Sequence, residues 1–226
     1  MGSEKILIVE DEEKIASIIW DYLAQNGFSY KWINNGSLVV SHVKRHPPDL
    51  ILLDLMLPGK QGTEICREIR KFSEVPIIMI TAKVDEVDRL IGLELGADDY
   101  ICKPFSPREV IARIKSVFRR VQPKRQDGLL IIEPITLNSD TWEVSIDGQK
   151  LDLTPSEFGL LHILMQHPNK VFSREELISR VLGHDFEGYD RTIDTHVKNL
   201  RKKIDRYLPD REIIRSVYGV GYRFSE

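Results

Sequence analysis

The chain has 226 residues, of which 42% are hydrophobic and 30% charged, and its formal net charge at pH 7 is −3. This composition is typical of a globular chain of one or two domains and argues against a wholly disordered chain. We expect no membrane partner, because no apolar run approaches the roughly 18 residues of a spanning helix and the first residues lack signal-peptide character. Two cysteines without a CxxC spacing, Cys66 and Cys102, indicate free thiols and a cytoplasmic location.

Strand and helix patterns alternate through the first 120 residues. Predicted strands lie near residues 5–9, 28–33, 49–54, 76–80 and 98–102, and predicted helices near 12–26, 36–46, 62–72, 84–95 and 106–120. Alternation with short connections favours a parallel sheet that carries helices on both faces. We therefore predict an α/β fold of the flavodoxin-like type, with five parallel strands in the order 2-1-3-4-5.

Carboxylates stand at the ends of two of these strands. The apolar run 50–53 ends in Asp54, and the run 5–9 leads into Glu10 and Asp11. The carboxyl ends of parallel strands share one edge of the sheet, which is where ligands bind in such folds. Like charges so close raise each other's pKa, and a divalent cation with a preference for hard oxygen ligands, Mg²⁺, would remove the repulsion.

Two more strand ends add a hydroxyl and an ammonium group. Thr81 follows the fourth strand and Lys103 follows the fifth, and both groups suit phosphate. Five motifs therefore occur in order at strand ends: Glu10-Asp11, Asp54 with Met56 and Pro58-Gly59, Thr81-Ala82, Gly96-Ala97-Asp98-Asp99-Tyr100, and Lys103-Pro104-Phe105. Together they resemble the receiver domain of bacterial two-component response regulators.

The resemblance implies a role for each of these positions. Asp54 would accept a phosphoryl group from a sensor histidine kinase. Mg²⁺ would be held by the Asp11 and Asp54 carboxylates and the Met56 carbonyl, with Glu10 nearby. Lys103 would pair with the phosphate, and Thr81 and Tyr100 would form the switch. The same region includes Ala82 and Pro104, and the bond between Lys103 and Pro104 is expected to be cis.

A stretch almost without apolar residues separates the two halves of the chain. We predict a receiver domain over residues 4–120, a linker over 121–128 and a second domain over 129–226. The second domain begins with short β segments near 129–132, 135–138, 142–146 and 150–153, with Asp147-Gly148 as a hairpin turn. Helices follow after a capping box at 154–157 and a second at 173–176, and the third helix covers about 190–207.

The third helix of this domain has two different faces. Ile193, Val197, Leu200 and Ile204 lie within one apolar stripe, and the opposite face is expected to carry Arg191, Thr195, Lys198 and Lys202. Segment 191–223 holds nine basic and four acidic residues. Strands near 212–217 and 222–224 then enclose a Gly-rich turn. This order indicates a winged helix-turn-helix, an α+β domain whose third helix enters the major groove of DNA.

The whole chain resembles the OmpR/PhoB subfamily through three further motifs: 153–158 (LTPSEF), 191–197 (RTIDTHV) and 218–223 (YGVGYR). The resemblance implies a transcription regulator that is not a dedicated enzyme, that forms a homodimer on phosphorylation, and that binds double-stranded promoter DNA and RNA polymerase. Its expected dimer residues are Arg89, Asp99, Glu109 and Arg113. Its expected DNA contacts are Arg191, Thr192, Thr195, His196, Lys198, Asn199, Arg201, Lys202, Lys203, Arg215 and Tyr218.

Three other functions fit part of the pattern. An aspartyl-phosphate phosphatase usually has a second acid two residues after the nucleophile, where this chain has Met56. A flavodoxin-like electron carrier would meet repulsion between the acids 10–13 and the flavin phosphate. A DNA-binding regulator that works without phosphorylation remains the main alternative. Relatives often carry Arg in place of Asn199 and Tyr218, so base preference cannot be copied from them.

Overall fold

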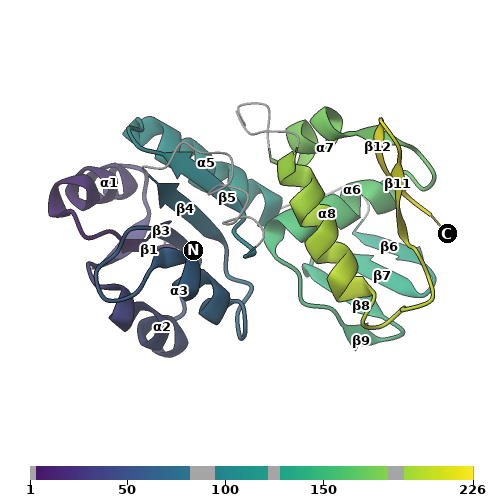
Figure 1. Ribbon diagram of the computed structural model, residues 1–226, viewed down its shortest axis with the longest axis horizontal. Coiled ribbons are helices and arrows are strands. Elements are labelled where there is room, and N and C mark those ends of the chain that lie inside the picture. Colours follow the sequence, from purple (N-terminus) through teal and green to yellow (C-terminus); the bar gives the residue numbers. More distant parts are fainter. Residues whose placement is uncertain (1–3, 82–94, 122–127, 183–190, 226) are drawn as a thin grey trace. The chain divides into compact units, whose positions relative to one another are not determined.

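The structure is a computed structural model that describes residues 4–81, 95–121, 128–182 and 191–225 (Figure 1). The chain divides into two compact units, residues 1–115 and 116–226, and each is described by itself. The predicted helix at 84–95 and most of the predicted linker lie outside the described residues, as do Ala82, Arg89 and the Arg191 side chain.

The first unit contains the predicted parallel sheet. Its strands are β1 (Lys5–Val9), β2 (Ser29–Ile33), β3 (Leu50–Asp54), β4 (Ile77–Thr81) and β5 (Asp99–Cys102). They pair in the order β2-β1-β3-β4-β5, and every pair is parallel. Strands β3 and β4 are buried along their full length. This burial explains their continuous apolar sequence, because such strands are covered on both faces.

Helices cover both faces of this sheet. They are α1 (Glu13–Gln25), α2 (Gly36–Arg45), α3 (Gly62–Ile69) and α5 (Pro107–Val121). Figure 1 shows α1 and α5 over one face and α2 and α3 over the other. The arrangement brings the carboxyl ends of β1, β3, β4 and β5 to one edge, as the sequence predicted. The bond between Lys103 and Pro104 is cis, which confirms that prediction.

The second unit is a winged helix-turn-helix domain preceded by a small sheet. Strands β6 (Leu129–Ile132), β7 (Ile135–Asn138), β8 (Glu143–Ile146) and β9 (Gln149–Lys150) form an antiparallel sheet in chain order. Asp147 and Gly148 connect β8 and β9 with φ values of 49° and 75°, as the hairpin prediction requires. The predicted strand 150–153 is shorter and begins one residue earlier, because Gln149 already pairs with Ile146.

Three helices and a second sheet complete this unit. They are α6 (Pro155–Gln166), α7 (Arg174–Val181) and α8 (Arg191–Ile204), with β11 (Ile214–Val217) and β12 (Gly221–Phe224) as the wing. A two-residue strand that the sequence did not reveal, β10 (Phe172–Ser173), pairs with β12. The four apolar residues predicted for one face of α8 are all buried. Among the helices of the described ranges, none combines the length and apolar character that crossing a bilayer requires.

Polar caps fix where α6 and α7 begin. The Glu157 carboxylate accepts a hydrogen bond from the Thr154 amide at 2.9 Å, and the Glu157 amide donates to the Thr154 hydroxyl, so the first capping box is confirmed. The second box is only half formed. Ser173 accepts from the Glu176 amide, but the Glu176 carboxylate pairs with Lys170 and Arg180 instead of reaching back to the start of the helix.

Candidate functional site

Three carboxylates meet at the sheet edge of the first unit. Glu10 follows β1, Asp11 comes next, and Asp54 is the last residue of β3. One ligand oxygen from each carboxylate lies within 4.8 Å of the other two. Glu10 and Asp54 are buried, whereas Asp11 is exposed. The cluster therefore has two acids within the protein and one that faces solvent.

Lys103 joins the two buried acids. Its ammonium group lies 2.6 Å from an Asp54 carboxylate oxygen and 2.9 Å from the Glu10 carboxylate. Burial raises the pKa of Glu10 to about 7; the Lys103 hydrogen bond opposes this shift and the Asp54 charge adds to it. Burial acts to lower the pKa of Lys103, but its bonds to Asp54 and Glu10 outweigh burial and the net shift is upward. Lys103 is therefore held as a cation between the carboxylates.

The backbone around Asp54 holds this side chain in place. The Met56 amide donates a hydrogen bond to the second Asp54 carboxylate oxygen at 2.8 Å. Gly62, the first residue of α3, packs directly against this segment, and its amide donates to the Leu55 carbonyl at 3.1 Å. A Cβ atom at position 62 would lie only 2.2 Å from the Asp54 carbonyl oxygen. Position 62 therefore has no space for a side chain.

The predicted switch residues lie on the strands beside the acid cluster. Thr81 ends β4 and is buried, and Lys103 and Pro104 directly follow β5. Tyr100 is also buried, with 8% of its surface exposed. Both predicted switch side chains therefore lie inside the protein in this structure, and their role as a switch stays a prediction.

Three of the four residues expected at a dimer interface, Asp99, Glu109 and Arg113, pair within one chain. Asp99 is buried, and its carboxylate lies 3.7 Å from the Arg113 guanidinium. Arg113 also lies 3.6 Å from Glu109, one turn earlier on α5. The Asp99 side chain is thus buried within the single chain, and its role at a dimer interface stays a prediction. Glu109, whose side chain is 41% exposed, stays accessible.

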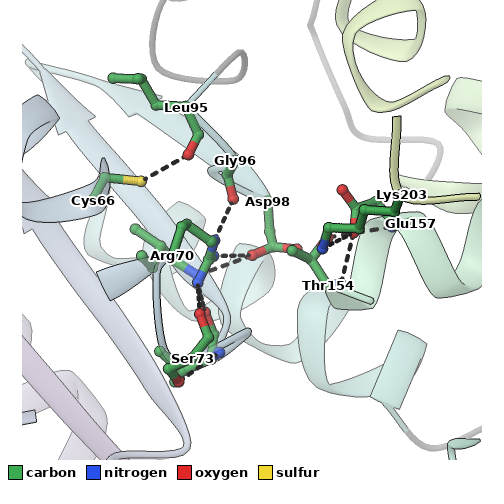
Figure 2. Close-up of polar contacts among 11 residues, drawn as sticks. Cys66, Arg70, Ser73, Leu95, Gly96, Asp98, Thr154, Glu157 and Lys203 are labelled. Atoms are coloured by element: carbon green, nitrogen blue, oxygen red, sulfur yellow. Dashed lines mark hydrogen bonds and ion pairs between the residues drawn. The ribbon is translucent and has the colours of Figure 1, made fainter. Parts of the chain in front are cut away.

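A second polar network of the first unit was not predicted. Figure 2 shows the Arg70 guanidinium between main-chain carbonyls and the buried Asp98. Arg70 donates to the Val75 carbonyl at 2.7 Å, the Gly96 carbonyl at 2.9 Å and the Asp98 carboxylate at 3.1 Å. It thereby fixes the chain before β4 to the chain before β5. Arg70 and Asp98 are 28 positions apart in the sequence, and nothing in the intervening segment signals this contact.

Helix α8 presents fewer polar groups than its sequence suggested. Lys198 and Lys202 are exposed and Asn199 is half-buried. The helix has three further predicted DNA contacts that are buried, Thr192, Thr195 and His196. Helical spacing places Thr195 opposite the apolar stripe, as predicted, but the packing around the helix buries its side chain. Its contact with DNA stays a prediction.

Two basic residues of α8 bond within the domain. The Lys203 ammonium donates to the buried Glu157 carboxylate at 2.8 Å and to the Asp152 carbonyl at 3.1 Å, so it joins α8 to the start of α6 (Figure 2). The Arg201 guanidinium donates twice to the Ile214 carbonyl on β11, at 2.8 and 2.6 Å. Both side chains therefore hold α8 within the domain, and their contacts with DNA stay predictions.

A further cluster connects α8 to α7 and the wing. The Tyr222 hydroxyl donates to the Asp194 carboxylate at 2.6 Å, and the Arg174 guanidinium donates to the same oxygen at 2.8 Å. Burial raises the pKa of the Tyr222 hydroxyl, and the Asp194 hydrogen bond raises it further. The hydroxyl is thereby kept as a donor. On the wing, Arg215 and Tyr218 do not belong to this cluster, and both are exposed.

Comparison with known proteins matches both units. Residues 6–115 match the family model described as response regulator receiver domain, and residues 148–224 match that described as transcriptional regulatory protein, C terminal. The chain is 51% identical to the transcriptional regulatory protein BaeR of Escherichia coli O6:H1, over 99% of this chain and 93% of the relative. It is 41% identical to the phosphate regulon transcriptional regulatory protein PhoB of Escherichia coli K12, over 99% and 98%.

A solved structure covers the same two units. Response regulator DrrB of Thermotoga maritima, an OmpR/PhoB homologue, matches 100% of both chains at 30% identity with a TM-score of 0.53. These similarities define a two-domain response regulator, in which a receiver precedes a DNA-binding domain that regulates transcription. The chain belongs to the OmpR/PhoB family of two-component response regulators.

Proposed function

We propose that Asp54 is the phosphoryl acceptor of this response regulator. The observation that carries the proposal is its carboxylate, buried at a strand end between the Lys103 ammonium at 2.6 Å and the Met56 amide at 2.8 Å. In the reaction an Asp54 oxygen attacks the phosphorus of a kinase phosphohistidine. The P–N bond breaks, the imidazole leaves with its electron pair, and an acyl phosphate forms on Asp54. Lys103 then pairs with the new phosphoryl oxygens.

The acid cluster also fits a divalent cation. Three carboxylates, with one oxygen of each within 4.8 Å of the others, offer oxygen ligands alone, which is the kind of ligand that Mg²⁺ prefers. Burial, followed by the Asp54 charge, raises the pKa of Glu10 to about 7, and a bound cation would oppose both effects. We propose that Asp11, Asp54 and the Met56 carbonyl hold Mg²⁺, with Glu10 beside them. When bound, the ion supplies positive charge for the transferred phosphoryl group.

Phosphorylation is proposed to act through the face next to Thr81 and Tyr100. The phosphoryl group adds up to about two negative charges beside the buried Thr81 hydroxyl. The resulting homodimer would bring two winged helices to paired half-sites on promoter DNA. We propose that the DNA contacts are the accessible residues Lys198, Asn199, Lys202, Arg215 and Tyr218. The partners would be a sensor histidine kinase and RNA polymerase, in the cytoplasm.

The test is phosphorylation of the purified full-length chain with a small phosphodonor, phosphoramidate, and Mg²⁺. We expect one phosphoryl group per chain, a shift from monomer to dimer in sedimentation, and tighter binding to duplex DNA. Asp54→Ala should abolish all three effects, because the acceptor oxygens are gone. Asp49→Asn is the matched control, since this exposed acid lies just before β3 at the opposite edge of the sheet.

Two outcomes separate the proposal from its rival. If Asp54→Ala still incorporates phosphate, the acceptor is another residue and the proposal is wrong. If wild-type chain is phosphorylated but binds DNA with unchanged affinity, the protein is a regulator that works independently of phosphorylation. Beryllofluoride with Mg²⁺, an aspartyl-phosphate mimic, should give the same dimer without covalent chemistry.

A further inference from the structure

A pocket of about 650 Å³ lies at the edge of the first unit's sheet that is opposite the acid cluster. Its walls come from the amino ends of β1 and β2, from the end of α2 and from the following residues Pro47 and Pro48. The acid cluster lies at the carboxyl ends of β1 and β3, so the two sites are separate. Sites for small molecules have volumes of roughly 300–1,000 Å³. The pocket is therefore large enough for a small organic molecule.

Basic groups line this pocket. Five of its side chains are cationic or become so at mildly acidic pH: Lys5, Lys31, His42, Arg45 and His46. None of the described residues that line it is Asp or Glu. Asp49, which follows Pro48, is exposed, and its carboxylate accepts a hydrogen bond from the Lys5 main-chain amide at 2.7 Å. The pocket therefore has an excess of positive charge.

Three of these basic groups act on the half-buried His42 ring. Burial lowers the pKa of His42, and the charges of His46, Lys31 and Arg45 lower it further. A positive charge has this effect because it repels the proton that the imidazole would bind. The rings of His42 and His46 are also close to each other, with centroids 5.2 Å apart. The basic groups therefore share one region of the pocket.

The end of helix α2 does not explain this arrangement by itself. Cations are favourable at a helix C-terminus, which accounts for Arg45 and His46. Lys31 belongs to β2, where it pairs with Leu7 of β1 and shares its face of the sheet. Arg45 donates through Nε to the Ser41 carbonyl at 3.2 Å. Its other guanidinium nitrogens and the Lys31 ammonium have no hydrogen-bond or ion-pair partner among the described residues. These donors are therefore available to a ligand.

We propose that the pocket binds a small phosphorylated molecule, with its phosphate among Lys31, Arg45 and His42. A guanidinium donates two parallel hydrogen bonds to phosphate oxygens, and an ammonium adds a point charge. A dianionic phosphate matches the two permanent charges of Lys31 and Arg45, whereas a carboxylate would balance only one of them. The rest of the molecule would lie against the apolar Pro47 and Pro48. The inference is independent of the proposed phosphorylation and DNA binding.

The test is calorimetric titration of the full-length chain, without Mg²⁺ and at constant ionic strength, with AMP and inorganic phosphate as probes. AMP should bind once per chain and more tightly than inorganic phosphate. Lys31→Gln and Arg45→Gln should each weaken AMP binding about tenfold, because each removes a charged hydrogen-bond donor. Lys44→Gln is the matched control on the same helix. The Lys44 ammonium lies 4.8 Å from the centre of the Phe72 ring, outside the pocket, so AMP binding should not change.

Nuclear magnetic resonance of the same chain locates the bound probe. AMP should shift the imidazole signals of His42 and His46 and leave the signals of Lys103 and of α8 unchanged. Largest shifts at Lys103 or α8 would overturn the inference, because the phosphate would then occupy the site proposed for phosphorylation or for DNA. So would an absence of AMP binding at millimolar concentration, equal affinity for AMP and inorganic phosphate, or equal weakening by Lys44→Gln.

The Asp54→Ala variant separates this inference from the proposed function. It lacks the proposed phosphoryl acceptor but keeps the pocket, so it should bind AMP as tightly as the wild type does. A loss of AMP binding in this variant would overturn the inference. Failure of the wild type to accept a phosphoryl group would contradict the proposed function and leave the AMP result as it stands.

Discussion

The acid cluster of the receiver and the polar face of α8 were both predicted from spacing, with different success. At the receiver edge, Glu10, Asp11, Asp54 and Lys103 come together as expected. On α8, several residues assigned to DNA are buried or bonded within the domain. The difference lies in what fixes each side chain. A parallel sheet brings strand ends to one edge whatever surrounds them, whereas the exposed face of a helix depends on every element packed around it.

The two regions also use buried charge differently. Lys103 is held between two buried acids at a site proposed to gain further charge. Lys203 pairs with the buried Glu157 at a capping box and fixes two helices against each other. The contacts of Lys103 with Glu10 and Asp54 are therefore expected to change when a cation or a phosphoryl group binds nearby. The Lys203–Glu157 pair is expected to change only when one of its two residues is replaced.

The largest effect is expected from Lys103→Met. Removing the ammonium leaves Glu10 and Asp54 buried without their cation, which should cost about 3–5 kcal/mol of unfolding free energy. Urea unfolding of the full-length chain measures the loss, and Mg²⁺ should restore part of it. Lys60→Met is the control, because the Lys60–Glu68 pair is partly exposed and its removal should cost about 1 kcal/mol or less. Equal losses in the two variants would show that Lys103 has no special role in the cluster.

A smaller effect is expected from Glu157→Ala in the second unit. This change removes half of the capping box and leaves Lys203, whose side chain is 20% exposed, without its carboxylate. The expected cost is about 2 kcal/mol. Hydrogen exchange of the full-length chain should show faster exchange in both α6 and α8. Asp152→Ala, which breaks the highly exposed pair with Lys150, should leave both helices unchanged. Faster exchange in α6 alone would mean that Lys203 does not join the helices.

The smallest effect concerns the pH dependence of the second unit. Burial lowers the pKa of His162, whose buried Nε2 has no hydrogen-bond partner among the described residues. The folded state therefore binds this proton less readily than the unfolded state. The stability from neutral His162 is complete above a pH of about 6.5 and is lost as pH falls through the lowered pKa. His162→Phe should remove this part of the acid sensitivity, by less than about 1 kcal/mol between pH 7.5 and 5.5.

Phenylalanine is chosen because the imidazole stacks near Phe158, with ring centroids 6.3 Å apart. The variant thus keeps the packing and removes the titration. Unfolding free energies of both proteins at each pH give the comparison directly. If the unfolding free energy of the His162→Phe variant falls between pH 7.5 and 5.5 by as much as that of the wild type, His162 takes no part in the pH dependence.

The sequence was sufficient for the sheet order and for the residues at its edge. Apolar runs that end in turn residues reveal buried strands, and buried parallel strands have few possible arrangements. The sequence was not sufficient to predict hydrogen bonds between a side chain and a backbone group far away in the chain. Arg70 binds carbonyls that any residue provides, and Arg201 binds the carbonyl of Ile214. Periodicity also gave the apolar face of α8 correctly, but it does not say that Thr192 and Thr195 are covered.

The close approach of Gly62 to Asp54 has a consequence for how the protein can vary. No charge, hydrogen bond or phosphate contact depends on a side chain at position 62. Yet any side chain there would meet the Asp54 backbone at 2.2 Å and push the Asp54 carboxylate away from Lys103. The tolerance of this position to mutation should therefore be as low as that of Asp54, because a missing methyl group, rather than a reactive atom, keeps the carboxylate in its place.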